Sequence, residues 1–365
     1  MLLPHALLQI DLPALQANYR DLVATAGGAE VAPAVKADAY GLGLVPCVQA
    51  LWQAGARSFF VAQGQEAASL RAALPEARIF VLNGPLPQEV AAMKAGRIIP
   101  MINSLDQLAL WRSLAGSEPL PTALHLDSGM SRLGFPPSEV AALAANPDLL
   151  EGLEIVLVAS HLASADEPHA PQTATQVAAF TRLADSLPPV AKVAPRSLAN
   201  SPGLYHAAVP GFAMARPGFA LYGGNPTPED PHPLRPVVTL QAPVLQVREV
   251  PAGTAVGYNA THVTNATARL ATLAIGYADG YDRSLSNRGR VTFDGKAASV
   301  VGRISMDLTT VDVTHLDPAL CQPGSMATLI GADPTLAEVA AAADTIGYEI
   351  LARMSPRLQR VHLEG

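Results

Sequence analysis

The fold is decided by the stretch Val31-Ala-Pro-Ala-Val-Lys36-Ala-Asp-Ala-Tyr40-Gly-Leu-Gly43. Its first five residues are apolar and end at a turn, which predicts a short buried strand over 31–35. Lys36 then lies at or just past the carboxyl end of that strand, where parallel α/β folds bind ligands. A lysine against an apolar wall has a lowered pKa and can form a Schiff base with a carbonyl. The stretch therefore predicts a ligand site around Lys36, although a lysine that only snorkels from a strand end is the alternative.

Short apolar runs alternate with amphipathic runs over the next 180 residues. This alternation is typical of a (β/α)8 barrel of the TIM type, whose active site lies at the carboxyl ends of the strands. A doubly wound open sheet is the alternative, but no G-x-G-x-x-G loop follows the first strand. The predicted strands are 31–35, 58–62, 78–82, 98–102, 123–127, 155–160, 196–200 and 212–216, and the predicted helices are 11–23, 45–54, 65–73, 88–95, 105–114, 138–145 and 173–187.

A proline-rich segment divides the chain. Residues 225–236 contain five prolines among polar residues, which predicts a loop or linker. The chain beyond it is β-rich, with one clear helix over 336–343. We therefore expect a barrel domain over 1–234 and a mostly β domain over 235–365, with a strand over 7–11 that could join the second domain. The β-rich segments are 237–250, 269–275, 290–293, 298–301, 309–313 and 326–330.

Composition narrows the functional class. The 365-residue chain has a formal net charge of −7 and no basic cluster, which argues against a nucleic-acid surface. Cys47 and Cys321 are far apart, which indicates a reducing compartment, and we expect no metal site. The sequence contains no run of 18 apolar residues, so we expect no membrane span. Residues 1–8 lack the basic start of a signal peptide. We expect a cytoplasmic protein.

Further polar residues gather at the predicted strand ends. Arg132 lies in the string 126–135, Leu-Asp-Ser-Gly-Met-Ser-Arg-Leu-Gly-Phe, and His161 follows the strand over 155–160. Asn200, Ser201 and Arg216 end the last two strands. Each alone has an ordinary structural role, such as a cap or a surface ion pair. Their common location at one end of a barrel favours a shared site.

Together with the Lys36 stretch, these strings resemble the motifs of the alanine racemases, which use pyridoxal 5′-phosphate. The second domain adds the strings 256–261, 275–281 and 302–307, so the resemblance covers nearly the whole chain. It implies an enzyme that interconverts L-alanine and D-alanine through an imine between the amino acid and the cofactor. It also implies a role in supplying D-alanine for peptidoglycan.

The resemblance assigns two bases to the reaction. Removal of the proton from Cα needs an electron sink, which the cofactor provides. Lys36 is implied to hold the cofactor and to act as the base on one face of Cα, with Tyr258 of the other subunit acting on the opposite face. A head-to-tail homodimer follows, in which Tyr258, Tyr277, Met306 and Asp307 of one subunit reach the substrate in the other.

The remaining assignments concern the cofactor. Arg216 is implied to face the pyridine nitrogen. A guanidinium donates a hydrogen bond but gives up no proton readily, which favours racemisation over transamination. Arg132 is implied to contact both cofactor and substrate. The other residues implied in cofactor binding are Tyr40, His161, Asn200, Ser201, Gly218, Phe219 and Tyr348.

The sequence departs from the family at one informative position. Where many members carry a carbamylated lysine near this arginine, this chain has His125, seven residues before Arg132. A carbamate is thus excluded there, and the orientation of Arg132 stays open. Rival functions are a broad-specificity racemase, a barrel-type decarboxylase and a non-catalytic cofactor carrier. Arg216 speaks against the decarboxylase, and the second domain with Tyr258 speaks against the carrier.

Overall fold

Eight parallel strands form the first sheet of the computed structural model, which describes residues 6–227, 229 and 232–364. The strand order is β2-β9-β8-β7-β6-β5-β4-β3. The two ends of the sheet meet at a parallel bridge between Ala34 and Phe60. The sheet is therefore a closed barrel, as the sequence predicts. The strands are β2 (Glu30–Val31), β3 (Ser58–Val61), β4 (Arg78–Val81), β5 (Ile99–Ile102), β6 (Leu120–His125), β7 (Leu153–Ala159), β8 (Arg196–Ser197) and β9 (Met214–Ala215).

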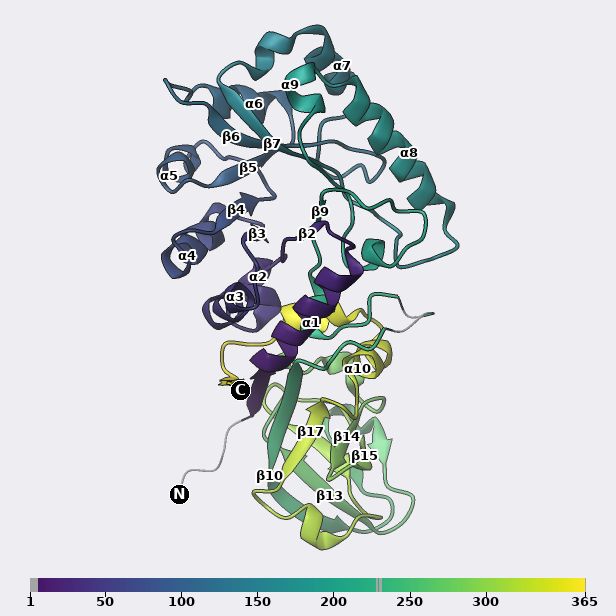
Figure 1. The fold of residues 1–365 in the computed structure, drawn as a ribbon. Coiled ribbons are helices and arrows are strands. Elements are labelled where there is room, and N and C mark those ends of the chain that lie inside the picture. The colour runs from purple at the N-terminus through teal and green to yellow at the C-terminus, as the bar shows by residue number, and fades with distance from the viewer. Residues whose placement is uncertain (1–5, 228, 230–231, 365) are drawn as a thin grey trace.

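Side chains fill the barrel. Phe60 and Phe80 stack inside it with ring centroids 4.6 Å apart, and Met101, Leu157 and Met214 belong to the same buried cluster. The interior is thus a packed core, and a ligand has to bind at one end of it. The helices follow the strands around the outside (Figure 1): α1 (Leu12–Thr25), α3 (Leu44–Gln53), α4 (Gly64–Ala73), α5 (Val90–Ala95), α6 (Leu105–Arg112), α7 (Pro137–Ala145), α8 (Pro171–Ser186) and α9 (Pro189–Lys192).

The first barrel strand is shorter than predicted. Regular pairing ends at Val31 because Pro33 has no N–H to donate. The next residues still follow the barrel, since the N–H of Ala32 donates to the carbonyl of Ala215 at 2.8 Å and that of Ala34 to Pro217 at 2.8 Å. Lys36 therefore emerges at the carboxyl end of the barrel.

The second domain contains a mostly antiparallel sheet in the order β13-β16-β15-β14-β17-β10-β1-β18, with β13 also paired to β10. β1 (Leu7–Asp11) pairs with β10 and β18, so the first described strand lies in the sheet of the second domain. α1 then leads from this sheet to the barrel (Figure 1). The other elements are β10 (Val238–Val250), β11 (Ala255–Val256), β12 (His262–Val263), β13 (Ala268–Leu273), β14 (Arg290–Phe293), β15 (Lys296–Val300), β16 (Thr309–Asp312), β17 (Met326–Ile330), β18 (Gln359–Leu363), α10 (Leu336–Ala342) and α11 (Gly347–Ala352).

Residues 228, 230 and 231 of the proline-rich segment lie outside the described part, and its described residues form neither helix nor strand.

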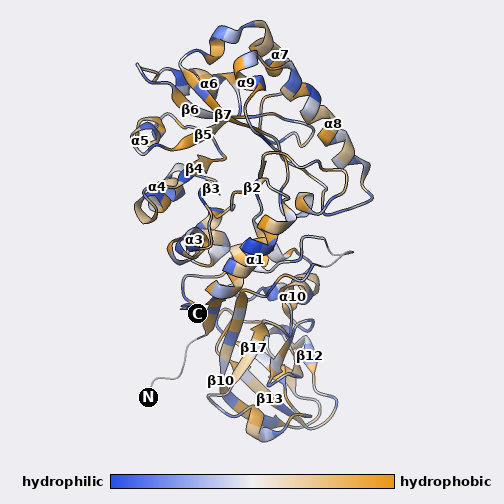
Figure 2. Cartoon of the chain, viewed as in Figure 1, coloured by the Kyte–Doolittle hydropathy of each residue, from blue (hydrophilic) through white to orange (hydrophobic). Residues whose placement is uncertain are grey.

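The helices around the barrel carry hydrophobic and hydrophilic residues side by side (Figure 2), as expected where one face packs on a core. Among the described residues, no helix has the length and apolar character needed to cross a membrane.

Candidate active site

The chain after Lys36 makes an uncommon left-handed turn, α2 (Lys36–Gly41). Ala37, Asp38, Ala39 and Tyr40 all have φ between 53° and 57°. For a residue with a side chain, this conformation is less stable than the right-handed one by roughly 1–2 kcal/mol. The turn therefore depends on bonds from the rest of the molecule.

Those bonds come from distant parts of the chain. The N–H of Ala37 donates to Oε1 of Glu66 at 2.5 Å, next to the start of α4. Arg360 of β18 donates from Nη2 to the carbonyl of Gly41 at 2.9 Å. A Cβ at Gly41 would lie 2.5 Å from the carbonyl oxygen of Leu351, so only glycine fits there. The second domain thus fastens the turn that carries Lys36.

Lys36 lies in a cavity of about 480 Å³ at the carboxyl end of the barrel. The barrel residues Ala34, Phe60 and Leu82 contribute to its wall. Most of the predicted site residues line this cavity, and the structure therefore brings together segments up to 312 residues apart. They are Lys36, Tyr40, His161, Asn200, Ser201, Arg216, Gly218, Phe219 and Tyr348.

One end of the cavity presents hydroxyl groups. Oγ of Ser201 accepts hydrogen bonds from the N–H groups of Gly218 at 3.0 Å and Ala220 at 3.2 Å. The proton of this hydroxyl is left free to donate to another group. A Cβ at Gly218 would lie 2.8 Å from Cζ of Tyr40, so the Tyr40 ring approaches the loop as closely as a glycine allows. The ring of Tyr348 stacks on Phe219 at 4.0 Å. This end suits an anion that accepts hydrogen bonds.

Burial and neighbouring cations control the titration of the site. Burial lowers the pKa of Lys36, and Arg132 lowers it further, against the opposing effect of Glu66. Burial lowers the pKa of His161 well below its ordinary value, with Arg216 and Arg132 acting in the same direction. His161 is therefore neutral at physiological pH, and the lysine more readily supplies a neutral amine.

Arg216 is fixed deep in the site. Nη1 donates to Oγ of Ser197 and Nη2 donates to the carbonyl of Ser160. Burial lowers the pKa of Arg216 to about 10, which leaves the guanidinium protonated at neutral pH. The site thus holds a fixed hydrogen-bond donor that does not act as an acid.

The remaining predicted residues do not line this cavity. Arg132 is exposed beside it, on the loop after β6. Tyr258, Tyr277, Met306 and Asp307 lie in the second domain of the same chain. The exposed fraction is 66% for Tyr258 and 53% for Met306. The predicted site residues are thus divided between the barrel cavity and exposed positions outside it.

Sequence reasoning missed several residues of the site. Glu66 caps α4 through the N–H of Gln63 at 3.1 Å and also holds Ala37. The Gln-x-x-Glu spacing at the start of a helix is a signal that could have drawn attention to it. Asp166 and Ile346 line the cavity without any local signal.

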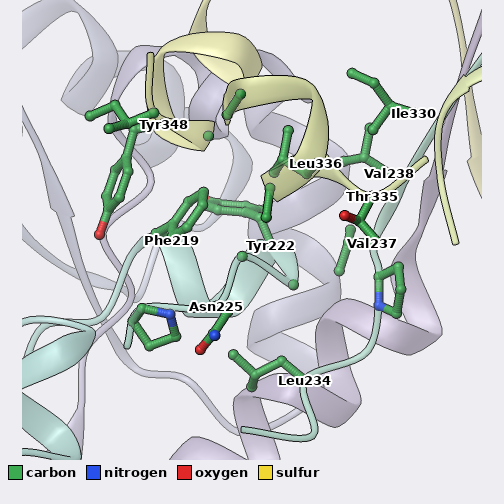
Figure 3. Close-up of a pocket in the computed structure, with 18 of the residues that line it drawn as sticks. Phe219, Tyr222, Asn225, Leu234, Val237, Val238, Ile330, Thr335, Leu336 and Tyr348 are labelled. Carbon is green, nitrogen blue, oxygen red and sulfur yellow. The ribbon is translucent and has the colours of Figure 1, made fainter. Parts of the chain in front are cut away.

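A second cavity of about 560 Å³ lies between the domains, and Figure 3 shows Phe219 and Tyr348 along its wall. It shares both of these residues, and also Asp166 and Ile346, with the Lys36 cavity. A Cβ at Gly347 would lie 2.6 Å from Cζ of Phe219, so this glycine leaves room for the ring. The lining of the second cavity is mainly apolar and includes no lysine, and the chemistry therefore belongs to the first.

A closed β/α barrel with a lysine-lined cavity at its carboxyl end, joined to a β domain, has the architecture of a two-domain barrel enzyme. The family profile of the alanine racemase N-terminal domain matches residues 10–226, and that of the C-terminal domain matches residues 237–362. The chain belongs to the alanine racemase family.

Relatives and solved structures agree over the full length. An alanine racemase of Methylobacterium sp. (strain 4-46) is 47% identical over 364 residues, which is 99% of either chain. A catabolic alanine racemase of Agrobacterium fabrum is 43% identical and aligns over 98% of this chain and 92% of its own. The crystal structure of alanine racemase from Bartonella henselae with covalently bound pyridoxal phosphate superposes with a TM-score of 0.94 at 39% identity, covering 99% of this chain and 100% of that one.

Proposed function

We propose that this protein interconverts L-alanine and D-alanine with pyridoxal 5′-phosphate held by Lys36. We also propose that two copies of the chain form a dimer, in which both copies contribute residues to each of the two active sites. The observation that carries the proposal is a lysine of lowered pKa in a cavity that also holds a fixed, protonated Arg216 and a row of hydroxyl donors. A relative with 39% identity carries the cofactor covalently.

The residues of the cavity fit this cofactor. Ser201 has a free hydroxyl proton beside Tyr40 and Tyr348, so these three side chains would hold the phosphate. Arg216 would donate to the pyridine nitrogen, and Lys36 would supply the amine. When bound, the cofactor supplies the electron sink that makes the Cα proton of alanine acidic.

Arg216 is expected to influence where the proton removed from Cα returns. Its guanidinium has a pKa of about 10 and keeps its proton at neutral pH. A partner that donates a hydrogen bond without giving up a proton leaves the sink weak. Return of the proton to Cα is then expected to be faster than its transfer to another atom, which favours racemisation over transamination.

The second base would come from a partner subunit. Lys36 Nζ would serve one face of Cα, and the opposite face needs a group from elsewhere. Tyr258, Tyr277 and Met306 are exposed side chains outside the cavity of their own chain. In a head-to-tail homodimer these residues, with Asp307, would reach the other cavity, and Tyr258 Oη would hold the second proton.

Both cysteines, Cys47 and Cys321, are buried free thiols, which fits a reducing compartment such as the cytoplasm. D-alanine made there would be available for peptidoglycan. A catabolic role is the alternative, since two relatives are named catabolic alanine racemases.

Replacing Gly218 by alanine is expected to weaken cofactor binding. The added Cβ would meet the ring of Tyr40, which is buried and packs against Tyr222 at 4.8 Å, so the ring cannot easily withdraw. We expect the Kd of the cofactor, measured by absorbance titration, to rise roughly tenfold, about 1.4 kcal/mol. Gly116→Ala is the matched control, since nothing lies within 4 Å of its Cβ position. An unchanged cofactor affinity in Gly218→Ala would show that Tyr40 does not bind the phosphate.

The test of the proposed function is the decay of optical rotation of pure L-alanine in the presence of the purified protein. L-serine and L-lysine serve as comparison substrates. Decay to zero with alanine and little change with the others supports the proposal. Similar decay with all three indicates a broad-specificity racemase. A protein that binds cofactor and leaves L-alanine unchanged contradicts it.

A further inference from the structure

The left-handed turn α2 carries two of the groups that would hold the cofactor. Lys36 begins the turn, Tyr40 lies four residues later, and both line the same cavity. The residues from Ala37 to Tyr40 all have left-handed backbone angles, which side chains disfavour. The shape of this turn sets the spacing between the amine of Lys36 and the hydroxyl of Tyr40, so whatever holds the turn in shape also sets that spacing.

The two ends of the turn need partners from outside it. Bonds within the segment satisfy its middle, where the N–H of Ala39 donates to the carbonyl of Val35 at 3.0 Å. A helical segment presents free N–H groups at its first end and free carbonyls at its last end, which a negative and a positive group stabilise respectively. In α2 these groups are the N–H of Ala37 and the carbonyl of Gly41, and each of them meets a charged side chain.

Glu66 holds the first end of the turn. Its Oε1 accepts from the N–H of Ala37 at 2.5 Å, and its Oε2 accepts from the N–H groups of Ala62 at 2.8 Å and Gln63 at 3.1 Å. One half-buried carboxylate thus joins the residue after Lys36 to the backbone between β3 and α4. Glu66 is not among the described residues that line the cavity, so its effect on a ligand passes through the turn.

Arg360 holds the last end of the turn. Its Nε and Nη2 donate to the carbonyl of Gly41 at 3.1 and 2.9 Å. Its Nη1 donates to the carbonyl of Ser355 at 3.0 Å, and Nη2 also donates to that of Met354 at 3.0 Å. The guanidinium therefore bridges α2 to the segment that follows α11, while β18, which carries it, pairs with β1. Arg360 also lies outside the described lining of the cavity.

We propose that Glu66 and Arg360 are positioning residues that clamp α2 at its two ends. The clamped turn keeps the amine of Lys36 and the hydroxyl of Tyr40 at one spacing, so that a single cofactor molecule engages both at once. Two contacts made by one ligand strengthen each other only while their spacing matches that ligand. The identity of the ligand rests on the proposed function, whereas the clamp on the turn rests on the hydrogen bonds.

Glu66→Gln separates this role from the capping of α4. The amide of glutamine has one acceptor oxygen, which two N–H groups at the start of α4 would share and for which Ala37 offers only one. We expect this oxygen to face α4, so that the N–H of Ala37 meets an amide nitrogen that only donates. The variant then keeps the cap of the helix and loses the contact with the turn.

The other end of the turn is tested by Arg360→Met, which keeps an unbranched side chain and removes every donor. Arg360→Lys retains a positive charge and N–H donors, and it is expected to recover part of the loss. Thermal unfolding of each variant is measured alongside, because the bonds of Arg360 to Ser355 and Met354 also support the second domain.

The measurement compares the whole cofactor with its two halves on the full-length protein freed of cofactor. The Kd of pyridoxal 5′-phosphate and of pyridoxal is obtained by absorbance titration, and that of inorganic phosphate by calorimetry. In Glu66→Gln and in Arg360→Met we expect the Kd of the whole cofactor to rise about tenfold, with the Kd of each half within about twofold of the wild type. A loss confined to the whole cofactor is the signature of a changed spacing, since general damage to the site weakens the halves as well.

Matched controls remove the same kinds of contact elsewhere. Oε2 of Glu139 accepts from the N–H of Leu105 at 3.0 Å, and Arg71 donates to the carbonyls of Gly96 at 2.9 Å and Ala77 at 2.8 Å. None of these bonds involves α2. Glu139→Gln and Arg71→Met should therefore leave all three Kd values unchanged.

Two results would overturn the proposal. One is an unchanged Kd of the whole cofactor in both clamp variants, and the other is an equal rise for the cofactor and its halves, which would show that Glu66 and Arg360 only support the fold. Racemisation of L-alanine is assayed separately on the same proteins. The expected Kd changes in a protein that does not racemise alanine would count against the proposed function and leave the positioning role standing.

Discussion

Replacing Lys36 by alanine is expected to abolish racemisation, with kcat/KM for alanine reduced at least about 10³-fold. The variant loses both the amine that holds the cofactor and the base on one face of Cα. Lys36 is the one lysine among the residues that line the cavity, and the other lysines, Lys94, Lys192 and Lys296, are exposed. No neighbouring amine can therefore take over.

The measurement pairs optical rotation with chemical trapping. Borohydride reduction of the wild-type protein, followed by peptide mass analysis, should place the cofactor mass on the peptide that contains Lys36. The Lys36→Ala variant should show no such peptide, and Lys296→Ala should behave as the wild type. Substantial racemisation by Lys36→Ala, or cofactor trapped on another lysine, would contradict the assignment.

The barrel was predictable because its signals are local. Apolar runs over 58–62 and 98–102 alternate with helical runs, and each strand end is fixed by its own sequence. The left-handed turn over Ala37–Tyr40 has no such signal, since alanine disfavours this conformation. It is imposed by Glu66 and Arg360, which lie far away in the sequence. Tertiary bonds of this kind cannot be read from a local pattern.

The site was predicted unevenly for a related reason. The strand-end positions of Lys36, His161 and Ser201 follow from the residues themselves, whereas the place of Tyr348 in the site rested on a family resemblance. The contact between Nδ1 of His125 and Oδ1 of Asn103, which lie 2.7 Å apart, was not predicted at all. It joins the ends of β5 and β6, and the orientation of the Asn103 amide depends on which backbone carbonyls face its nitrogen.

Replacing Tyr258 by phenylalanine is expected to lower kcat/KM by about 10²- to 10⁴-fold, the usual contribution of a positioned acid or base. The equilibrium constant for racemisation is one, so the loss must be equal in both directions, and steady-state rates cannot assign a base to an enantiomer. Exchange of the Cα proton into heavy water can make that assignment. The family resemblance predicts that Tyr258→Phe loses exchange preferentially from L-alanine. Equal loss of exchange from both enantiomers would count against it.

A mixture of the Lys36→Ala and Tyr258→Phe proteins tests where Tyr258 acts. If each site combines Lys36 of one chain with Tyr258 of the other, a mixed dimer has one site with both residues intact and one with neither. Equal mixing with free subunit exchange should then restore about a quarter of the wild-type activity, since half of the dimers are mixed and each has one working site. The exposed position of Tyr258, outside the cavity of its own chain, is the structural reason to expect this recovery. If both residues acted within one chain, every site would lack one of them, and no activity would return on mixing.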